Sequence, residues 1–307
     1  MLSYAIRRLL GAIPTVFIII TVSFFLIRLA PGGPFALERP LPANIMRNLE
    51  AIYNLDKPLL VQFWLYLQNL FQGNLGPSMV YRDLSVAEII MSGLPVSIQF
   101  GGAAILLALV LGCVLGSYAA LKQNSPSDYS VMAVAMVGIT IPNFVVAPLL
   151  QLVFGVELGW LPVAGWGEGA FVNKIMPVLA LALPQIAVVS RLTRGSMIEI
   201  LRSNHIRTAR AKGLPERIVV WRHSLRAALL PVVSYLGPAA AALLTGSVVI
   251  ETIFGVPGVG RFFVQGALNR DYTLVMGTVV LIATFIVIFN LIVDLVYGFL
   301  DPKVRYD

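Results

Sequence analysis

The chain consists of long runs of apolar residues separated by shorter polar segments. An α-helix rises about 1.5 Å per residue and the hydrocarbon core of a bilayer is about 30 Å thick, so about 20 apolar residues can cross it. Six runs reach this length, over residues 9–30, 96–120, 130–154, 175–194, 229–251 and 274–298. The pattern predicts an all-α polytopic membrane protein with six transmembrane helices.

The polar segments divide the chain into four parts. Residues 1–30 form an N-terminal tail and a first span that is retained, because its apolar run is too long for a typical signal peptide. Residues 31–95 form an insertion on the outer face, in which the amphipathic stretch 56–73 is expected to lie at the membrane surface. Residues 96–300 hold the other five spans and a basic loop at 195–228, and residues 301–307 form a tail.

Composition agrees with a membrane-embedded chain. Hydrophobic residues make up 58% and charged residues 12%, and the mean hydropathy is +0.86. A soluble domain carries about a quarter charged residues, so too little polar surface remains to keep this chain in water. The net charge of +7 belongs to no soluble basic domain, so we expect lipid around the chain and no nucleic acid as a partner.

The positive charges predict the orientation. Nine of the Lys and Arg residues fall in 191–228, and the segments on the same side of the membrane bring the total there to fourteen, against seven on the other side. Basic loops stay in the cytoplasm, so six spans place both termini and the basic loop there.

Small residues form a stripe along the second span. They recur every four residues and therefore share one helical face, at Ala104, Ala108, Gly112, Gly116 and Ala120. Such a stripe allows another helix to approach closely, although the sequence does not say whether that helix belongs to the same chain.

Few charged residues fall within the spans. Asp294 lies near the cytoplasmic end of the last span, where it either pairs with Arg7 or Arg8 or serves transport. Arg28, Glu251 and Arg270 lie near the outer boundary. We expect the polar ends of these three to extend to the interface rather than line a path.

The densest charge lies in "HIRTARAKGLPERIVVWRHSLRAALLP", residues 205–231, with six Lys or Arg and one acidic residue. Ser203 and Asn204 are favoured N-cap residues, and Gly213 is typical of a helix end. Pro215 then suits the start of another helix, with Glu216 in its first turn. The charge alone would suit a segment that only fixes the membrane orientation. The helix start and stop residues, however, predict a short, rigid, protruding helix and favour a docking role.

This stretch resembles the cytoplasmic signature of permease subunits of ATP-binding-cassette (ABC) importers, particularly the oligopeptide and dipeptide branch. Arg207, Thr208 and Ala209 occupy the places of the family's Glu-Ala-Ala, Gly213 matches its glycine, and Leu230–Pro231 close the motif. The departures, and the seventeen residues between Gly213 and Pro231, are typical of that branch. Further similar stretches cover nearly the whole chain: "RRLLGAIPTVFIIITVSFFLIRLAPGGPF", "YNLDKPLLVQFWLYLQNLFQGNLGPS", "VIETIFGVPGVGRFFVQGALNRDY" and "VDLVYGFLDPKVRY".

The resemblance implies a type I ABC importer permease fold in a bacterial inner membrane. It implies a second homologous permease, two cytoplasmic ATPase subunits that bind ATP and Mg²⁺, and an extracytoplasmic peptide-binding receptor. The short helix would be the ATPase-coupling helix, formed by Asn204, His205, Ile206, Arg207, Thr208, Ala209, Arg210, Ala211, Lys212 and Gly213. Transport would follow by alternating access, with dipeptides, oligopeptides, murein peptides or nickel complexes as cargo.

Candidate chemistry within the chain is sparse. The sequence has no phosphate-binding Gly-x-x-x-x-Gly-Lys-Ser/Thr loop and no nucleophile elbow, so we expect no catalytic residues and no cofactor in this chain. His205 and His223 lack partners at metal-ligand spacing, so no metal site is expected. The "GVPGVGRFF" segment is interpreted as a structural turn rather than a ligand site. Mildly polar residues in the fifth span are candidates for the translocation path: Ser234, Tyr235, Thr245 and Ser247.

Two other classes of protein remain as alternatives. A stand-alone secondary carrier or channel would transport solute without an ATPase, although the spans lack the several buried carboxylates expected of a proton-coupled carrier. A membrane-embedded enzyme would need a catalytic cluster that the sequence does not contain.

Overall fold

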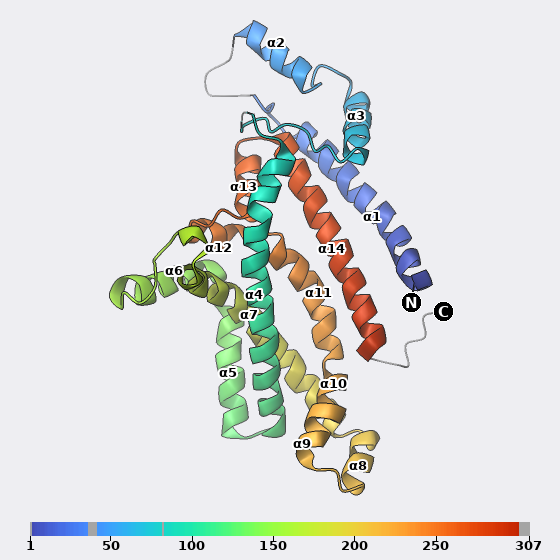
Figure 1. Ribbon diagram of the computed structural model, residues 1–307, viewed down its shortest axis with the longest axis vertical. Coiled ribbons are helices and arrows are strands. Elements are labelled where there is room, and N and C mark those ends of the chain that lie inside the picture. Colours follow the sequence, from blue (N-terminus) through green and yellow to red (C-terminus); the bar gives the residue numbers. More distant parts are fainter. Residues whose placement is uncertain (1, 36–41, 82, 301–307) are drawn as a thin grey trace.

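A computed structural model describes residues 2–35, 42–81 and 83–300, with side chains described for residues 10–35, 42–81 and 83–296. This part of the chain is helical apart from loops and one isolated bridge between Pro77 and Ser85. Long helices run roughly alongside one another between two ends of the molecule (Figure 1). They are α1 (Leu2–Leu29), α4 (Val86–Leu121), α5 (Pro126–Thr140), α7 (Phe171–Leu201), α11 (Leu230–Leu244) and α14 (Tyr272–Leu300).

Five stretches of the described chain form helices long and apolar enough to cross a membrane, and a bent pair makes a sixth. The helix of the second span begins earlier than the apolar run. Ser85 and Glu88 form a capping box there, in which the Glu88 backbone N–H donates to Ser85 Oγ and the Ser85 N–H donates to Glu88 Oε2 at 2.8 Å. Two orphan N–H groups are thereby satisfied, and the helix starts at Val86.

The predicted span over 130–154 is a pair of helices with a sharp bend between them. The helix α5 ends at Thr140, and the chain then turns by 102° into α6 (Asn143–Leu150) and the π-helical turn η1 (Gln151–Glu157). Pro142 explains the position of the break, because a proline disfavours helical backbone in the residue before it, and Ile141 is indeed extended.

The fifth predicted span, 229–251, is also interrupted. The helix α11 ends at Leu244 and α12 covers Val248–Ile253. Gly246 between them has φ +104°, which lies outside the helical region and which residues with a side chain rarely adopt. The chain therefore changes direction at this point.

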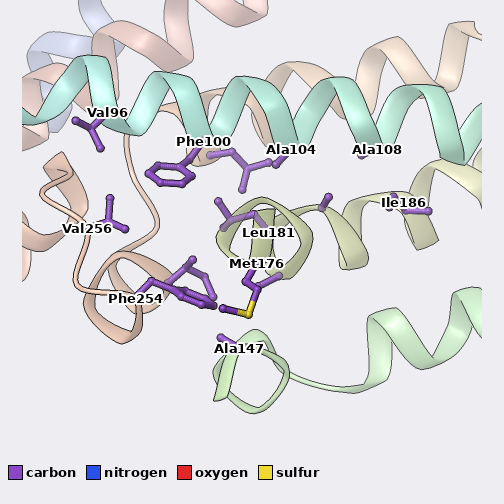
Figure 2. Packing of buried hydrophobic residues seen from close by; sticks show 14 residues of the cluster. Val96, Phe100, Ala104, Ala108, Ala147, Met176, Leu181, Ile186, Phe254 and Val256 are labelled. Carbon is purple, nitrogen blue, oxygen red and sulfur yellow. The ribbon is translucent and has the colours of Figure 1, made fainter. Parts of the chain in front are cut away.

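The small-residue stripe of α4 packs against α7 of the same chain, which supplies the partner that the sequence left open. A Cβ atom on Gly112 would lie 2.6 Å from Val189 Cβ, and one on Gly116 would lie 2.4 Å from the Ser190 carbonyl oxygen. Figure 2 shows Phe100, Ala104 and Ala108 on the face of α4 that is turned to α7, while Met176 and Phe254 lie on the other side of α7, toward Ala147 of α6 (Asn143–Leu150). Close backbone approach thus joins α4 and α7 into one unit.

At the other edge of the molecule, α1 lies beside α14 (Figure 1). The insertion contributes α2 (Ala43–Ile52) and α3 (Leu59–Phe71), and α3 packs Phe63, Tyr66 and Leu67 against α1. Arg28 of α1 is half-buried and has partners within the chain. Its Nε donates to Gln62 Oε1 at 2.8 Å and its guanidinium lies 3.6 Å from the centroid of the Phe24 ring.

The expectation that the polar end of Glu251 extends outward is wrong. Glu251 is 4% exposed, and its Oε1 accepts a hydrogen bond from Ser97 Oγ of α4 at 2.7 Å. Its Oε2 accepts from the Arg261 backbone N–H at 3.0 Å, at the start of α13 (Val259–Leu268). The carboxyl group of Glu251 therefore caps α13 from within the chain.

The same contact explains the glycine-rich turn before α13. A Cβ atom on Gly258 would lie 2.2 Å from Glu251 Cδ, so only glycine lets the backbone approach the carboxyl group this closely. The Val259 N–H completes the network by donating to Ser97 Oγ at 2.9 Å. Glu251 thus occupies the place where an anion would meet this helix start, in agreement with the interpretation as a structural turn.

The remaining charges of the spans have different placements. Arg270 is exposed, and its Nη1 donates to the Gly33 carbonyl oxygen at 3.5 Å. Asp294 lies on α14. The side chains of Arg7 and Arg8 and the tail 301–307 fall outside the described residues, so the pairing predicted for Asp294 stays a prediction.

Candidate functional site

The predicted short helix exists and lies at one extremity of the molecule. The helix α7 ends at Leu201, and α8 (Asn204–Ala211) begins after two intervening residues. Together with α9 (Glu216–Ile218), α8 forms the tip opposite the end that carries α2 and α3 (Figure 1).

The helix α8 is anchored on one face and exposed on the other. Ile206 is fully buried and Ala209 is 7% exposed, and both pack in a cluster with Val219. The opposite face exposes the remaining residues of the predicted coupling helix: Asn204, His205, Arg207, Thr208, Arg210, Ala211, Lys212 and Gly213. A rigid basic face is therefore presented outward.

The start of α8 differs from the prediction in one detail. Ser203 occupies the N-cap position, but its side chain makes no capping hydrogen bond. Its hydroxyl donates instead to the Ile200 carbonyl oxygen at 2.6 Å, and it also lies 2.9 Å from His205 Nδ1. Ser203 therefore ties α8 back to the end of α7.

The structure confirms the prediction that the short helix stops at Gly213. Its φ of +74° lies in the left-handed region, and its N–H donates to the Arg210 carbonyl oxygen at 2.9 Å. The Leu214 N–H donates to the Ala209 carbonyl oxygen at 3.3 Å. These two bonds satisfy the last carbonyls of the helix and turn the chain sharply toward α9.

Arg210 has a partner that the sequence analysis did not identify. Its Nη2 and Nε lie 2.5 and 3.1 Å from the two carboxylate oxygens of Glu216. The Arg210 guanidinium lowers the pKa of the Glu216 carboxyl, and Glu216 raises the pKa of Arg210. This pair closes the turn at Gly213 and leaves Arg207 and Lys212 as the more available cations of α8.

We expect Glu216→Gln to have only a small effect on stability. Both side chains are about half exposed, and an exposed ion pair contributes roughly 0–1 kcal/mol. A lowered pKa means that the contribution is complete above the ordinary value of 4.5 and is lost as the pH falls through the lowered value. Thermal unfolding of the purified chain should therefore show a small destabilisation at pH 7 that shrinks in acid. A destabilisation that grew in acid would contradict this account.

The four candidates for the path occupy different settings on α11 and α12. Ser234 Oγ donates to the Leu230 carbonyl oxygen at 3.0 Å, and Ser247 is the half-buried N-cap residue of α12. Thr245 is 5% exposed, and its hydroxyl donates to the Ala241 carbonyl oxygen at 2.8 Å. The structure therefore places these three against their own helices or at their ends.

Tyr235 reaches across to a neighbouring helix. Its hydroxyl donates to Gln185 Oε1 of α7 at 2.5 Å. Gln185 was missed by the sequence analysis, although an amide inside an otherwise apolar span is itself a signal that it needs a partner. The pair forms a polar bridge between α7 and α11. Among the residues that the structure describes, His, Cys, Asp and Glu form no group of three that could hold a metal ion.

Comparisons with known proteins agree with this geometry. A family model described as "Binding-protein-dependent transport system inner membrane component" matches residues 108–306, and its N-terminal counterpart matches residues 1–99. The oligopeptide transport system permease protein OppB of Escherichia coli K12 is 54% identical over 306 residues, which cover 100% of both chains. The dipeptide transport system permease protein DppB of Bacillus subtilis is 42% identical, over 99% of this chain and 98% of its own.

The fold has solved counterparts. A chain of the inward-facing MetNI methionine ABC transporter superposes with a TM-score of 0.53 at 16% identity, over 70% of this chain and 97% of its own. An amino acid ABC transporter gives a TM-score of 0.50, also at 16% identity, over 71% and 95%. The chain therefore has the predicted ABC importer permease fold, and it belongs to the family of binding-protein-dependent transport system inner membrane components.

Proposed function

We propose that this chain is the permease subunit of an ATP-driven peptide importer, in which it forms one half of the translocation pathway. The observation that carries the proposal is the exposed basic helix α8 at the tip of a membrane helix bundle, in a chain 54% identical to a protein named an oligopeptide permease. The dipeptide permeases among its relatives keep dipeptides as an alternative cargo.

The partners follow from the family and from what this chain does not do itself. A second homologous permease completes the pathway, two ATPase subunits bind ATP and Mg²⁺ and dock on α8, and an external receptor delivers the peptide. The excess of Lys and Arg in the segments on the α8 side supports a cytoplasmic location for α8 and both termini, in a bacterium. The chain itself catalyses no reaction.

The exposed face of α8 provides the site at which the ATPases act. ATP binding closes the two ATPase subunits, which moves the docked α8 helices, and the spans then reorient between outward-facing and inward-facing states. Ile206 and Ala209 are buried on the opposite face against Val219, so a push on α8 is passed to the helical segment 214–224 rather than absorbed by rotation of the helix.

The proposal is tested by reconstitution in proteoliposomes. Vesicles with both permeases, the ATPases and the peptide-loaded receptor should import radiolabelled di- and oligopeptides only when ATP is present on the α8 side. Omitting the ATPases should abolish import. Import by this chain alone, driven by an ion gradient, would overturn the proposal in favour of a stand-alone carrier.

The path is tested by replacing Ser234, Tyr235, Thr245 and Ser247 together with alanine. Peptides of different sequence are best passed by a weakly polar wall, so we expect import to fall severalfold for all of them. Tyr235→Phe, which keeps the ring and removes the hydrogen bond to Gln185, separates wall polarity from helix bridging. Unchanged import of several peptides by the fourfold variant would remove these residues from the path.

A further inference from the structure

An ion pair with a buried carboxylate joins two helices close to the proposed coupling helix. Asp128, in the first turn of α5, is fully buried. Arg194 of α7 donates through Nε to Oδ1 and through Nη2 to Oδ2, both at 2.6 Å. The Asn124 backbone N–H adds a third bond to Oδ2 at 2.9 Å. Two guanidinium nitrogens of Arg194 thus donate to the two carboxylate oxygens of Asp128. This bidentate geometry fixes the orientation of the two side chains as well as their separation.

The ion pair lies at the end of the helix bundle that is connected to α8. Arg194 lies two turns before α7 ends at Leu201, and α8 follows directly. A second bond, from Arg202 Nη2 to Gln123 Oε1 at 3.1 Å, holds the other end of the same α4–α5 turn. The turn that joins α4 to α5 is therefore tied to the last part of α7 at two points.

The buried carboxylate distinguishes this pair from the exposed Arg210–Glu216 pair: the Asp128 side chain is 0% exposed and that of Arg194 is 26% exposed. Removing the charge of Arg194 would leave the buried Asp128 carboxylate without its cation, whereas water replaces either partner of an exposed pair. The pair is therefore costly to open. Such a contact suits helices that move together and is unsuited to helices that slide past each other.

The packing of α4 on α7 supports the same conclusion independently. At Gly112 and Gly116 the two backbones approach too closely for a side chain to be inserted. The helices α4 and α7 are joined along their length by this stripe, and α5 is joined to them at the α8 end by Asp128. Packed elements of this kind respond to a local displacement as one body.

We propose that Asp128 and Arg194 are positioning residues that make α4, α5 and α7 move as a single body with α8. Displacement of α8 by an ATPase then becomes reorientation of three helices. Without the pair, α8 and the end of α7 move while α5 lags, and ATP is hydrolysed without transport. The inference rests on the proposed function, because it assigns the route by which ATPase movement reaches the spans.

The test uses the complete transporter in proteoliposomes and measures ATP hydrolysed per peptide imported. We expect Asp128→Asn, which keeps the shape and removes the charge, to raise this ratio at least threefold. Arg194→Lys keeps the charge but loses the fork, so its ratio should be intermediate. Asp56→Asn, the same change at an exposed aspartate, should leave the ratio at the wild-type value. If the Asp128→Asn chain does not insert into the membrane, the ATP-to-peptide ratio of Arg194→Lys is compared with that of the wild type instead.

A distance measurement separates transmission from general damage. Spin labels at Val134 of α5, which is 74% exposed, and at Gly195 of α7, where a side chain meets open space, report the α5–α7 separation in a Cys113→Ala background. In the wild-type complex we expect one narrow distance that is the same with and without ATP, and in Asp128→Asn a broadened one.

An unchanged ratio in both Asp128→Asn and Arg194→Lys, or a wild-type α5–α7 distance that changes with ATP, overturns the single-body inference. A wild-type complex that imports no peptide overturns the proposed function instead, and the label distances still decide whether Asp128 holds α5 to α7.

Discussion

Replacing Gly213 with proline should reduce ATP-driven import to background. Proline fixes φ near −65°, whereas Gly213 has φ +74°, and proline also lacks the N–H that donates to the Arg210 carbonyl oxygen. The combined cost is about 3 kcal/mol or more, and about 1.4 kcal/mol corresponds to a factor of ten in an equilibrium. The conformation in which α8 is presented to an ATPase would thus be populated about a hundredfold less. The measurement is uptake of labelled peptide by proteoliposomes that contain the complete transporter.

Two further substitutions separate backbone strain from bulk at this position. A Cβ atom on Gly213 would have no neighbour within 4 Å, so Gly213→Ala tests the left-handed backbone alone, at a cost of roughly 1–2 kcal/mol. Asparagine adopts this conformation more readily, so Gly213→Asn should retain most of the import. The expected order of import is wild type, Asn, Ala, Pro, with equal amounts of chain in the membrane. If proline transported as well as asparagine, the helix stop would not be needed for coupling.

The second large effect is expected for Glu251→Ala, as a loss of stability. The substitution removes the acceptor for Ser97 Oγ and for the Arg261 N–H in a site that is 4% exposed to solvent. Each buried donor left without an acceptor costs about 1–3 kcal/mol, so the free energy of unfolding should fall by about 3 kcal/mol or more. Thermal unfolding in detergent, followed by tryptophan fluorescence, should show a transition lowered by several degrees.

Glu251→Gln keeps one acceptor oxygen and the side-chain volume, so its destabilisation should be smaller than that of Glu251→Ala. Glu157→Gln is the matched control, because Glu157 is exposed and the same chemical change should have little effect there. Ser97→Ala combined with Glu251→Gln should be less destabilising than the sum of the two single changes, since both residues belong to one network. Additive effects, or an unaltered transition in Glu251→Ala, would show that the carboxyl group does not hold α13 to α4.

Some of the features behind these expectations can be predicted from the sequence, and others cannot. The six apolar runs, the small-residue stripe and the helix stop at Gly213 are local patterns, and all three were predicted. Hydropathy and residue spacing report which face of a helix is buried and where a helix ends, because these properties depend on neighbours within a few turns. The same locality explains why the basic loop could be interpreted as a short, protruding helix.

The sequence did not predict the direction that the chain takes after α5, or the partners of the buried charged side chains. Pro142 lies at the break between α5 and α6, but the 102° bend depends on how α6 packs against α7, α12 and η1. Glu251 appeared to be a boundary residue because nothing near it in the sequence showed that Ser97, 154 positions away, would donate to it. Asp128 similarly gave no sign of Arg194, which lies 66 positions along the chain.

The sequence by itself determined that this chain is a membrane-embedded helix bundle with a stiff basic helix in its largest basic loop. Burial of apolar runs and the backbone preferences of glycine and proline act within one helix, so they can be derived from the order of residues. The tertiary structure alone decided which helix fills the groove of α4, which carboxyl group caps α13 and which ion pair fastens α5 to α7. Each of these contacts joins residues distant along the chain, and their pairing depends on the shape that the packed helices take together.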